Sequence, residues 1–162
     1  MGNTQSAGTN HNKYWNIGGK LGNKFEDIIF ESLKKALNEH LYEDVKIMQT
    51  GRTNDKGKDI IIEFECKTLN LFEIAFSKGS NKKAVIYIEC KSSNSNQTLR
   101  REKFMTSIER GSALKIDYYI LLTNSKIMAC DYYNVENELS SKGIQFILID
   151  QYLLARFLRK NN

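Results

Sequence analysis

The sequence predicts a single α/β domain in which a mixed sheet of about five strands is flanked by helices. The segment 84–90 is apolar on both faces, which is typical of a central strand covered on each side. Strand-like and helix-like segments alternate through the second half of the chain, and this alternation favours a sheet with helices on its faces. A length of 162 residues suits one domain with a substantial core.

Residues 1–22 are expected to form a flexible arm, because they are rich in Asn, Gly, Ser and Thr and show no apolar period. The folded domain is therefore expected to span residues 23–162. From residue 23 to about residue 39, apolar side chains recur at i, i+3 and i+4, which predicts an amphipathic helix.

Strand signals follow that helix. A short strand is predicted over 45–50, a polar loop over 51–58 and a β-branched strand over 59–64. Residues 65–83 are ambiguous: the stretch 69–76 could form one further strand, followed by a turn.

The elements expected beyond the central strand are a loop over 92–98, a helix over 99–114, a strand over 117–123, a helical segment over 126–142 and a strand over 144–149. Part of the helical segment, 127–133, could also pass for a strand. Gly143 is expected to end that segment, and Asp150 to cap a closing amphipathic helix that runs to about residue 159.

The composition, with 41% hydrophobic and 27% charged residues, is typical of a soluble globular protein. No apolar run is long enough to span a bilayer and no signal-peptide core is present, so we expect a cytoplasmic protein without membrane contact. The chain has two histidines and three widely spaced cysteines without a Cys-x-x-Cys pair, which argues against a structural zinc site.

The formal net charge of +5 fits a polyanionic partner such as DNA. Basic residues concentrate between positions 91 and 115, for which a solvated helix face is the alternative interpretation. Because they directly follow a candidate active site, we expect phosphate contacts from Arg100, Arg101 and Lys103.

The candidate active site combines Asp59, at the head of one strand, with Glu89-Cys90-Lys91, at the foot of another. Asp59 and Glu89 would supply the hard oxygen ligands that a divalent ion requires. Strand alternation places Lys91 on the same face as Glu89, with Cα atoms roughly 7 Å apart, while Cys90 points away. Taken alone, Asp59 would be explained as a turn residue. The combination predicts metal-dependent phosphodiester hydrolysis, with Lys91 stabilising charge or orienting water.

These residues and the order of elements resemble the PD-(D/E)xK nuclease superfamily and, within it, the Mrr-type restriction endonucleases. The likeness covers residues 20–160 and implies a restriction-endonuclease-like fold. The separation of Asp59 from Glu89 is longer than in this branch, so residues 65–83 resemble an insertion. The segments that carry the likeness are the helix opening Gly22-Asn23-Lys24-Phe25-Glu26, the loop and strand from Gly51 to Ile62, the strand end Glu89-Cys90-Lys91 and the tail from Tyr118 onward.

The resemblance implies a DNA endonuclease that uses Mg²⁺, for which Mn²⁺ could substitute. Asp59, Glu89 and the Cys90 carbonyl would hold the ion, Glu26 would join them, and Lys91 would complete the catalytic set. Bacterial or phage defence is the implied setting, for a restriction-type enzyme or an effector nuclease module that acts as a homodimer or within a larger complex. A Holliday-junction resolvase and a catalytically inactive module that binds nucleic acid or protein are the alternatives.

Two points about this assignment stay open in the sequence. Glu26 could belong to a helix cap, because Asn23-x-x-Glu26 has capping-box spacing. A second Glu-Cys-Lys occurs at residues 65–67, and we predict that it is not the active site. Six residues of extended chain would separate Asp59 from Glu65 by roughly 20 Å, which is too far for two ligands of one ion.

Overall fold

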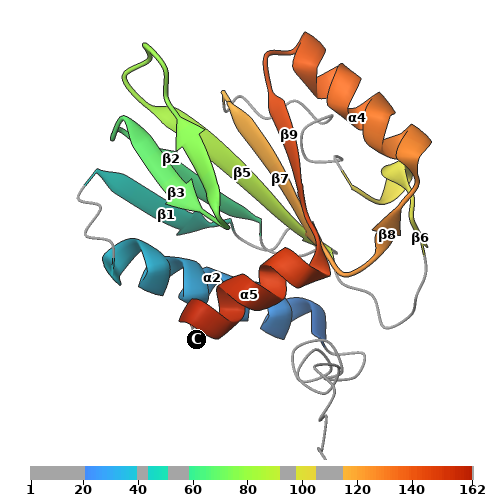
Figure 1. The fold of residues 1–162 in the computed structure, drawn as a ribbon, viewed down its shortest axis with the longest axis horizontal. Coiled ribbons are helices and arrows are strands. Elements are labelled where there is room, and N and C mark those ends of the chain that lie inside the picture. Colours follow the sequence, from blue (N-terminus) through green and yellow to red (C-terminus); the bar gives the residue numbers. More distant parts are fainter. Residues whose placement is uncertain (1–20, 40–43, 51–58, 92–97, 105–114, 162) are drawn as a thin grey trace, which may run out of the picture.

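The computed structural model describes residues 21–39, 44–50, 59–91, 98–104 and 115–161. Its centre is a five-stranded sheet in the order β1-β2-β5-β7-β9 (Figure 1). Strands β1, β2 and β5 pair antiparallel, whereas β5, β7 and β9 pair parallel, so the sheet is mixed as predicted. These strands span Val45–Gln49, Ile60–Phe64, Ala84–Lys91, Tyr118–Thr123 and Gln145–Ile149.

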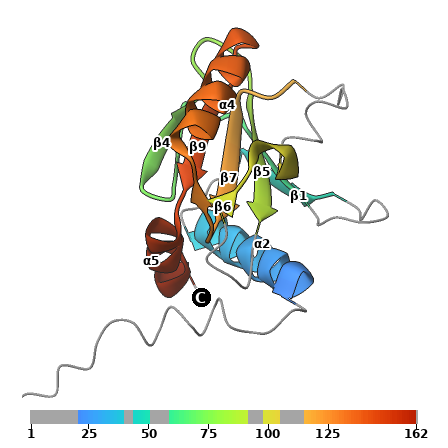
Figure 2. The same cartoon turned by 90° about the vertical axis from the view of Figure 1, so that its right-hand side faces the viewer.

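Helices cover both faces of the sheet (Figures 1 and 2). On one face, alternate positions of β2 and β5, such as Ile62 and Ile86, are fully buried against α2 and α5. On the other face, Tyr119 packs in a second cluster with Val135 of α4. Burial on both faces explains why β5 is apolar from Ala84 to Ile88. The helices span Leu21–Glu39 (α2), Ala129–Ser141 (α4) and Gln151–Asn161 (α5).

Two predicted helix boundaries are confirmed, the Asp150 cap of α5 and the end of α4 before Gly143. The Asp150 side chain accepts hydrogen bonds from the second and third backbone N–H groups of α5, at 3.0 and 2.9 Å, as an N-cap does. After α4, Gly143 adopts a positive φ of 73°, and the N–H of Ile144 donates to the Leu139 carbonyl at 2.9 Å. The left-handed conformation of Gly143 therefore ends α4, and the chain continues into β9.

Residues 69–76, which the sequence left ambiguous, do not form the single strand that it allowed, because the chain reverses there. Strands β3 (Thr68–Leu71) and β4 (Ile74–Ser77) form an antiparallel hairpin outside the main sheet. Its two central residues, Phe72 and Glu73, have φ values of 53° and 61°, and a two-residue turn with both φ values positive matches the twist of a hairpin.

Helix α5 holds this turn through both of its central residues. The Phe72 ring packs against Phe157 with 4.5 Å between ring centroids. Arg156 forms an ion pair with Glu73 at 2.8 Å. A positive φ is costly for residues other than glycine, so contacts from the neighbouring helix stabilise a conformation that the local sequence does not favour.

The helix predicted over 99–114 is wrong at its start. Leu99 belongs to a short strand, β6 (Thr98–Leu99), which pairs parallel with β8 (Lys126–Ile127). A single 3-10 turn, η2 (Arg101–Lys103), follows it, and residues 105–114 lie outside the described structure. Pairing with a strand distant in sequence therefore overrides the local helical pattern here. Because Lys126 and Ile127 form β8, α4 begins at Ala129 and not at residue 126 as predicted.

At the N-terminal end, α2 begins at Leu21, two residues before the predicted boundary, and residues 1–20 of the expected arm lie outside the described structure. None of the described helices is both long enough and apolar enough to cross a membrane.

Candidate active site

The register of the sheet brings Asp59 and Glu89 together. Ile60 of β2 pairs with Ile88 of β5, so one further step along this antiparallel register sets Asp59 opposite Glu89. Directly opposed residues in such a pair have Cβ atoms roughly 4.5–5.5 Å apart. The backbone of Asp59 is fixed from the other side, because its carbonyl accepts a hydrogen bond from the Thr50 N–H at 2.9 Å. Two predicted site residues are thus neighbours although 30 positions separate them in sequence.

Lys91 joins the two acids on the α4 side of the sheet. Its Nζ lies 3.3 Å from Oε1 of Glu89, two positions earlier on the same strand. Glu89 is 3% exposed, whereas the Lys91 side chain retains 26% of its exposure. A buried carboxylate requires hydrogen-bonding or ionic partners, and Lys91 supplies one while its ammonium still reaches solvent.

Two tyrosines that sequence reasoning missed complete this cluster. The Tyr87 hydroxyl donates a hydrogen bond to Oδ2 of Asp59, and the Tyr119 hydroxyl donates one to Oε2 of Glu89. The only local signal was that Tyr87 lies two positions before Glu89 and therefore shares its face. Tyr119 could not be assigned without the pairing of β5 with β7.

Glu26 and Cys90 lie on the other face of the sheet. Cys90 is buried in the core cluster that α2 covers, and Glu26 is a buried residue of α2. Burial raises the pKa of the Cys90 thiol well above its usual value, and the charges of Glu26, Asp59 and Glu89 raise it further, while Lys91 lowers it. Glu26 therefore contributes to the negative potential near the foot of β5. Because Asn23 lies inside α2, its assignment as the cap of a capping box is wrong.

The arrangement suits an ion held by few protein ligands. Within the described ranges, no three His, Cys, Asp or Glu side chains form a group that could hold a metal ion. Mg²⁺ is usually bound through one or two carboxylates and takes its other oxygens from water and substrate phosphates. Asp59 and Glu89 match this mode in charge, ligand type and spacing. The loop 51–58, with Asp55, lies outside the described structure.

The three basic residues predicted to contact DNA follow β6: Arg100 precedes the 3-10 turn η2, and Arg101 and Lys103 belong to it. Arg100 forms an ion pair with Asp131 of α4 at 3.0 Å, and Arg101 forms one with Glu138 of the same helix. Lys103, at the end of η2, is exposed. Two of the three charges are thus already engaged with carboxylates, so a phosphate contact by either arginine would involve sharing or exchanging that partner.

The second Glu-Cys-Lys lies at the opposite end of the sheet from Glu89. Phe64, the last residue of β2, pairs with Ala84, the first residue of β5, and residues 65–67 follow immediately. Asp59 precedes β2 at its other end, so the whole strand separates the two positions. This geometry agrees with the prediction that residues 65–67 do not form a site with Asp59.

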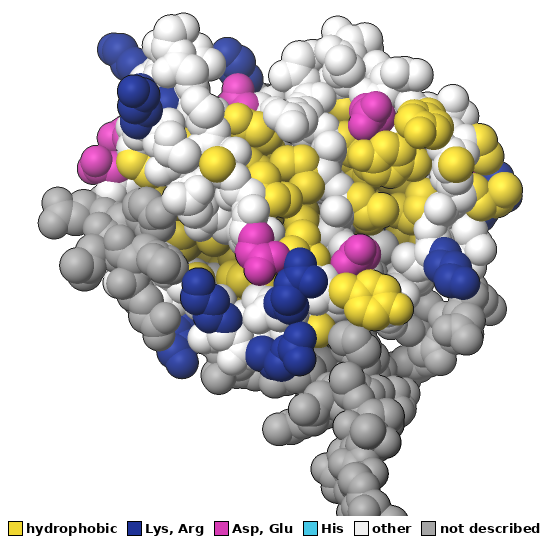
Figure 3. All heavy atoms as spheres, in the orientation of Figure 1, with side chains coloured by type: hydrophobic (Ala, Val, Ile, Leu, Met, Phe, Trp, Pro, Cys, Tyr) yellow, Lys and Arg dark blue, Asp and Glu magenta, His cyan; other side chains and the backbone are white. Residues whose placement is uncertain are grey.

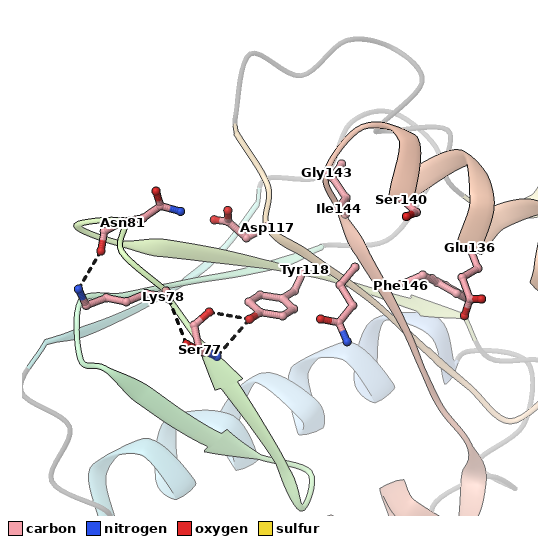
Figure 4. Close-up of a pocket in the computed structure, with 12 residues that line it drawn as sticks. Ser77, Lys78, Asn81, Asp117, Tyr118, Glu136, Ser140, Gly143, Ile144 and Phe146 are labelled. Carbon is pink, nitrogen blue, oxygen red and sulfur yellow. Dashed lines mark hydrogen bonds between the residues drawn. The ribbon is translucent and has the colours of Figure 1, made fainter.

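A cavity of about 680 Å³ also lies away from the acids (Figure 4). Ser77, Lys78 and Asn81 line it on one side, and Asp117 and Tyr118 approach from the start of β7. The Tyr118 hydroxyl donates to the Ser77 carbonyl at 2.6 Å, which joins the hairpin to the sheet. Tyr118 pairs near the start of β5, whereas Glu89 and Lys91 lie at its end, so this cavity is not part of the acid site.

Comparison with known proteins places the fold. No protein-family model matches the chain, and no curated protein matches it by sequence. Among solved structures it is similar to the MspJI restriction endonuclease in complex with a 27-mer oligonucleotide, with a TM-score of 0.53 and 15% identity over 95% of this chain and 32% of that chain.

A second similar structure is the DNA modification-dependent restriction endonuclease AspBHI, with a TM-score of 0.48 and 17% identity over 93% of this chain and 33% of that chain. The chain thus spans about a third of the length of each of these proteins. The likeness to MspJI, together with the mixed five-stranded sheet between helices, shows that the chain has a restriction-endonuclease-like α/β fold.

Proposed function

We propose that the protein is a metal-dependent endonuclease that hydrolyses DNA phosphodiesters. The observation that carries this proposal is the pairing of Asp59 with Glu89 across two adjacent strands, with Lys91 at 3.3 Å from Glu89 on the same face. Two carboxylates for one hard cation and one ammonium for the phosphate are the groups that such hydrolysis requires.

Each residue has a distinct part in the proposed reaction. When bound, Mg²⁺ (or Mn²⁺ in its place) would polarise the scissile phosphate and lower the pKa of the attacking water. Asp59, Glu89 and the carbonyl of Cys90 would hold that ion. Lys91 would orient the water or stabilise the charge that develops on the phosphate oxygens, because its ammonium lies beside a metal-binding carboxylate and reaches solvent. Glu26 would add to the negative potential that attracts the cation.

DNA as the substrate is supported by the net charge of +5 and by the fold. MspJI, which has the similar fold, is described as a restriction endonuclease in complex with an oligonucleotide. Restriction-type defence, an Mrr-type ancestry and action as a homodimer or within a larger complex are parts of the same proposal. The match to about a third of MspJI favours a nuclease module that works with further domains or partners.

A cleavage assay tests the proposal. The chain is incubated with supercoiled plasmid, single-stranded DNA and a four-way junction, each with Mg²⁺, with Mn²⁺ and with EDTA. We expect plasmid nicking or linearisation with either metal and none with EDTA. Cleavage restricted to the junction would favour the resolvase alternative. DNA binding without cleavage under any metal condition would contradict the proposal and favour a catalytically inactive binding module.

A further inference from the structure

Tyr87 and Tyr119 form a stacked pair next to the two acids, Asp59 and Glu89. They are direct partners in the parallel register of β5 and β7, and their rings stack with 5.9 Å between centroids and 12° between planes. Tyr119 is fully buried and Tyr87 is 5% exposed. The other side of the Tyr119 ring stacks on Phe146 of β9, also at 5.9 Å. Neighbours on both sides therefore hold the Tyr119 ring in one orientation.

Each hydroxyl of this pair is directed at one of the two acids. Tyr87 donates to Asp59 and Tyr119 donates to Glu89, so the two tyrosines match the two carboxylates one to one. On Glu89 the contacts divide between the oxygens, because Tyr119 donates to Oε2 and Lys91 lies beside Oε1. A donor on one oxygen fixes the rotation of a carboxylate and thereby aims its other oxygen.

A phenol suits this task better than a charged donor. A neutral hydroxyl satisfies a buried carboxylate by hydrogen bonding while leaving its negative charge available to a cation. A lysine or arginine in the same place would cancel that charge. Tyrosine also carries its hydroxyl on a rigid ring, so stacking of the ring determines where the donor lies.

We propose that Tyr87 and Tyr119 are positioning residues that orient Asp59 and Glu89 for binding of a divalent cation. This inference rests on the proposed function, because it assigns the two carboxylates to one ion. It predicts that loss of either hydroxyl weakens binding of the ion, although neither tyrosine needs to touch the metal or the DNA. Outer partners of metal ligands typically change metal affinity or activity by about 10- to 100-fold when removed.

The test compares Tyr87→Phe and Tyr119→Phe with Tyr118→Phe. Tyr118 is the neighbour of Tyr119 on β7, but its side chain packs against the other core cluster, and its hydroxyl contacts Ser77 of β4 instead of the acids. All three variants lose one hydrogen-bonded hydroxyl and keep the ring, so Tyr118→Phe controls for a general loss of stability. Direct Mn²⁺ binding is measured by calorimetry, and the Mg²⁺ concentration for half-maximal cleavage is measured on plasmid.

For Tyr87→Phe and Tyr119→Phe we expect the half-saturating Mg²⁺ concentration and the Mn²⁺ dissociation constant to rise about 10- to 100-fold, with a smaller change in the rate at saturating metal. DNA affinity in EDTA and the metal dependence of Tyr118→Phe should equal those of the wild type. Wild-type metal dependence in both test variants, or an equal shift in Tyr118→Phe, would overturn the positioning role while leaving the proposed function standing. A wild-type chain that neither binds Mn²⁺ nor cleaves DNA would overturn both.

Discussion

At the scale of single residues, the site depends on charges that the fold brings together at one end of β5. Glu89 is buried beside Asp59, and two neighbouring carboxylates repel each other unless cations or hydrogen bonds offset their charge. Lys91 and the tyrosine hydroxyls supply part of that compensation. In the proposed function, a bound divalent ion would supply more.

Substitution of the three catalytic candidates tests this arrangement. Asp59→Ala, Glu89→Ala and Lys91→Ala should each abolish cleavage in the plasmid assay while thermal melts show a folded domain. The two carboxylate variants should bind DNA in EDTA as tightly as the wild type or slightly more tightly, because a charge that repels the phosphates is gone. Full cleavage by Asp59→Ala, or a marked loss of DNA affinity in it, would contradict the assigned role.

Prediction from the sequence placed the two acids and the lysine near one another but missed the tyrosines that contact the acids. Glu89 and Lys91 could be placed on one face because the strand period is two residues. Asp59 could be placed next to them because its strand adjoins theirs. Tyr119 could not be assigned to Glu89, because this requires the register between β5 and β7, which are separated by 26 residues (92–117) of loop, turn and undescribed chain.

At the scale of elements, the β3–β4 hairpin shows where local patterns were insufficient. A two-residue turn with positive φ values normally contains Gly, Asn or Asp, and the Leu-Phe-Glu-Ile sequence here has none of these. The stretch therefore resembled one continuous strand. The turn depends instead on α5, which contacts Phe72 through Phe157 and Glu73 through Arg156.

Substitution of two neighbouring residues in α5 should distinguish the contribution of the aromatic contact from that of the ion pair. Phe157→Ala removes a buried ring and should destabilise the protein by about 3–5 kcal/mol in urea denaturation. Arg156→Ala removes an exposed ion pair and should have a much smaller effect, because surface ion pairs contribute little. Equal losses in the two variants would show that the turn is not held mainly by apolar packing.

At the scale of the whole molecule, the order of the five main-sheet strands and the three helices was predictable because their apolar periods are clear and two helix boundaries carry their own signals. Asp150 and Gly143 mark such boundaries and act as predicted. The surface that would contact DNA in the proposed function was less predictable. Figure 3 shows Lys and Arg side chains over α5, in the lower centre, and at the upper left, so basic charge is not confined to the segment 91–115. Arg156, Arg159 and Lys160 belong to α5.

The salt dependence of DNA binding tests the assignment of Arg100 and Arg101. If both contact phosphates, their joint replacement by Ala should lower affinity similarly for unrelated sequences and reduce the slope of log affinity against log salt by about 1.8. Lys82→Ala with Lys83→Ala, an equal charge loss at the far end of β5, should leave the slope unchanged.

An unchanged slope in the arginine variant, combined with a lower melting temperature, would contradict that assignment. It would indicate that the ion pairs with Asp131 and Glu138 serve to fasten β6 and η2 to α4.

The two Glu-Cys-Lys sequences of the chain allow the most direct test of the acid site at the foot of β5. Plasmid cleavage with Mg²⁺ is compared between Glu89→Ala and the double variant Glu65→Ala, Lys67→Ala, after both are shown to be folded. We predict that Glu89→Ala is inactive and that the double variant keeps most of the wild-type activity, because residues 65–67 lie a whole strand away from Asp59. An inactive but folded double variant, together with an active Glu89→Ala, would contradict the account.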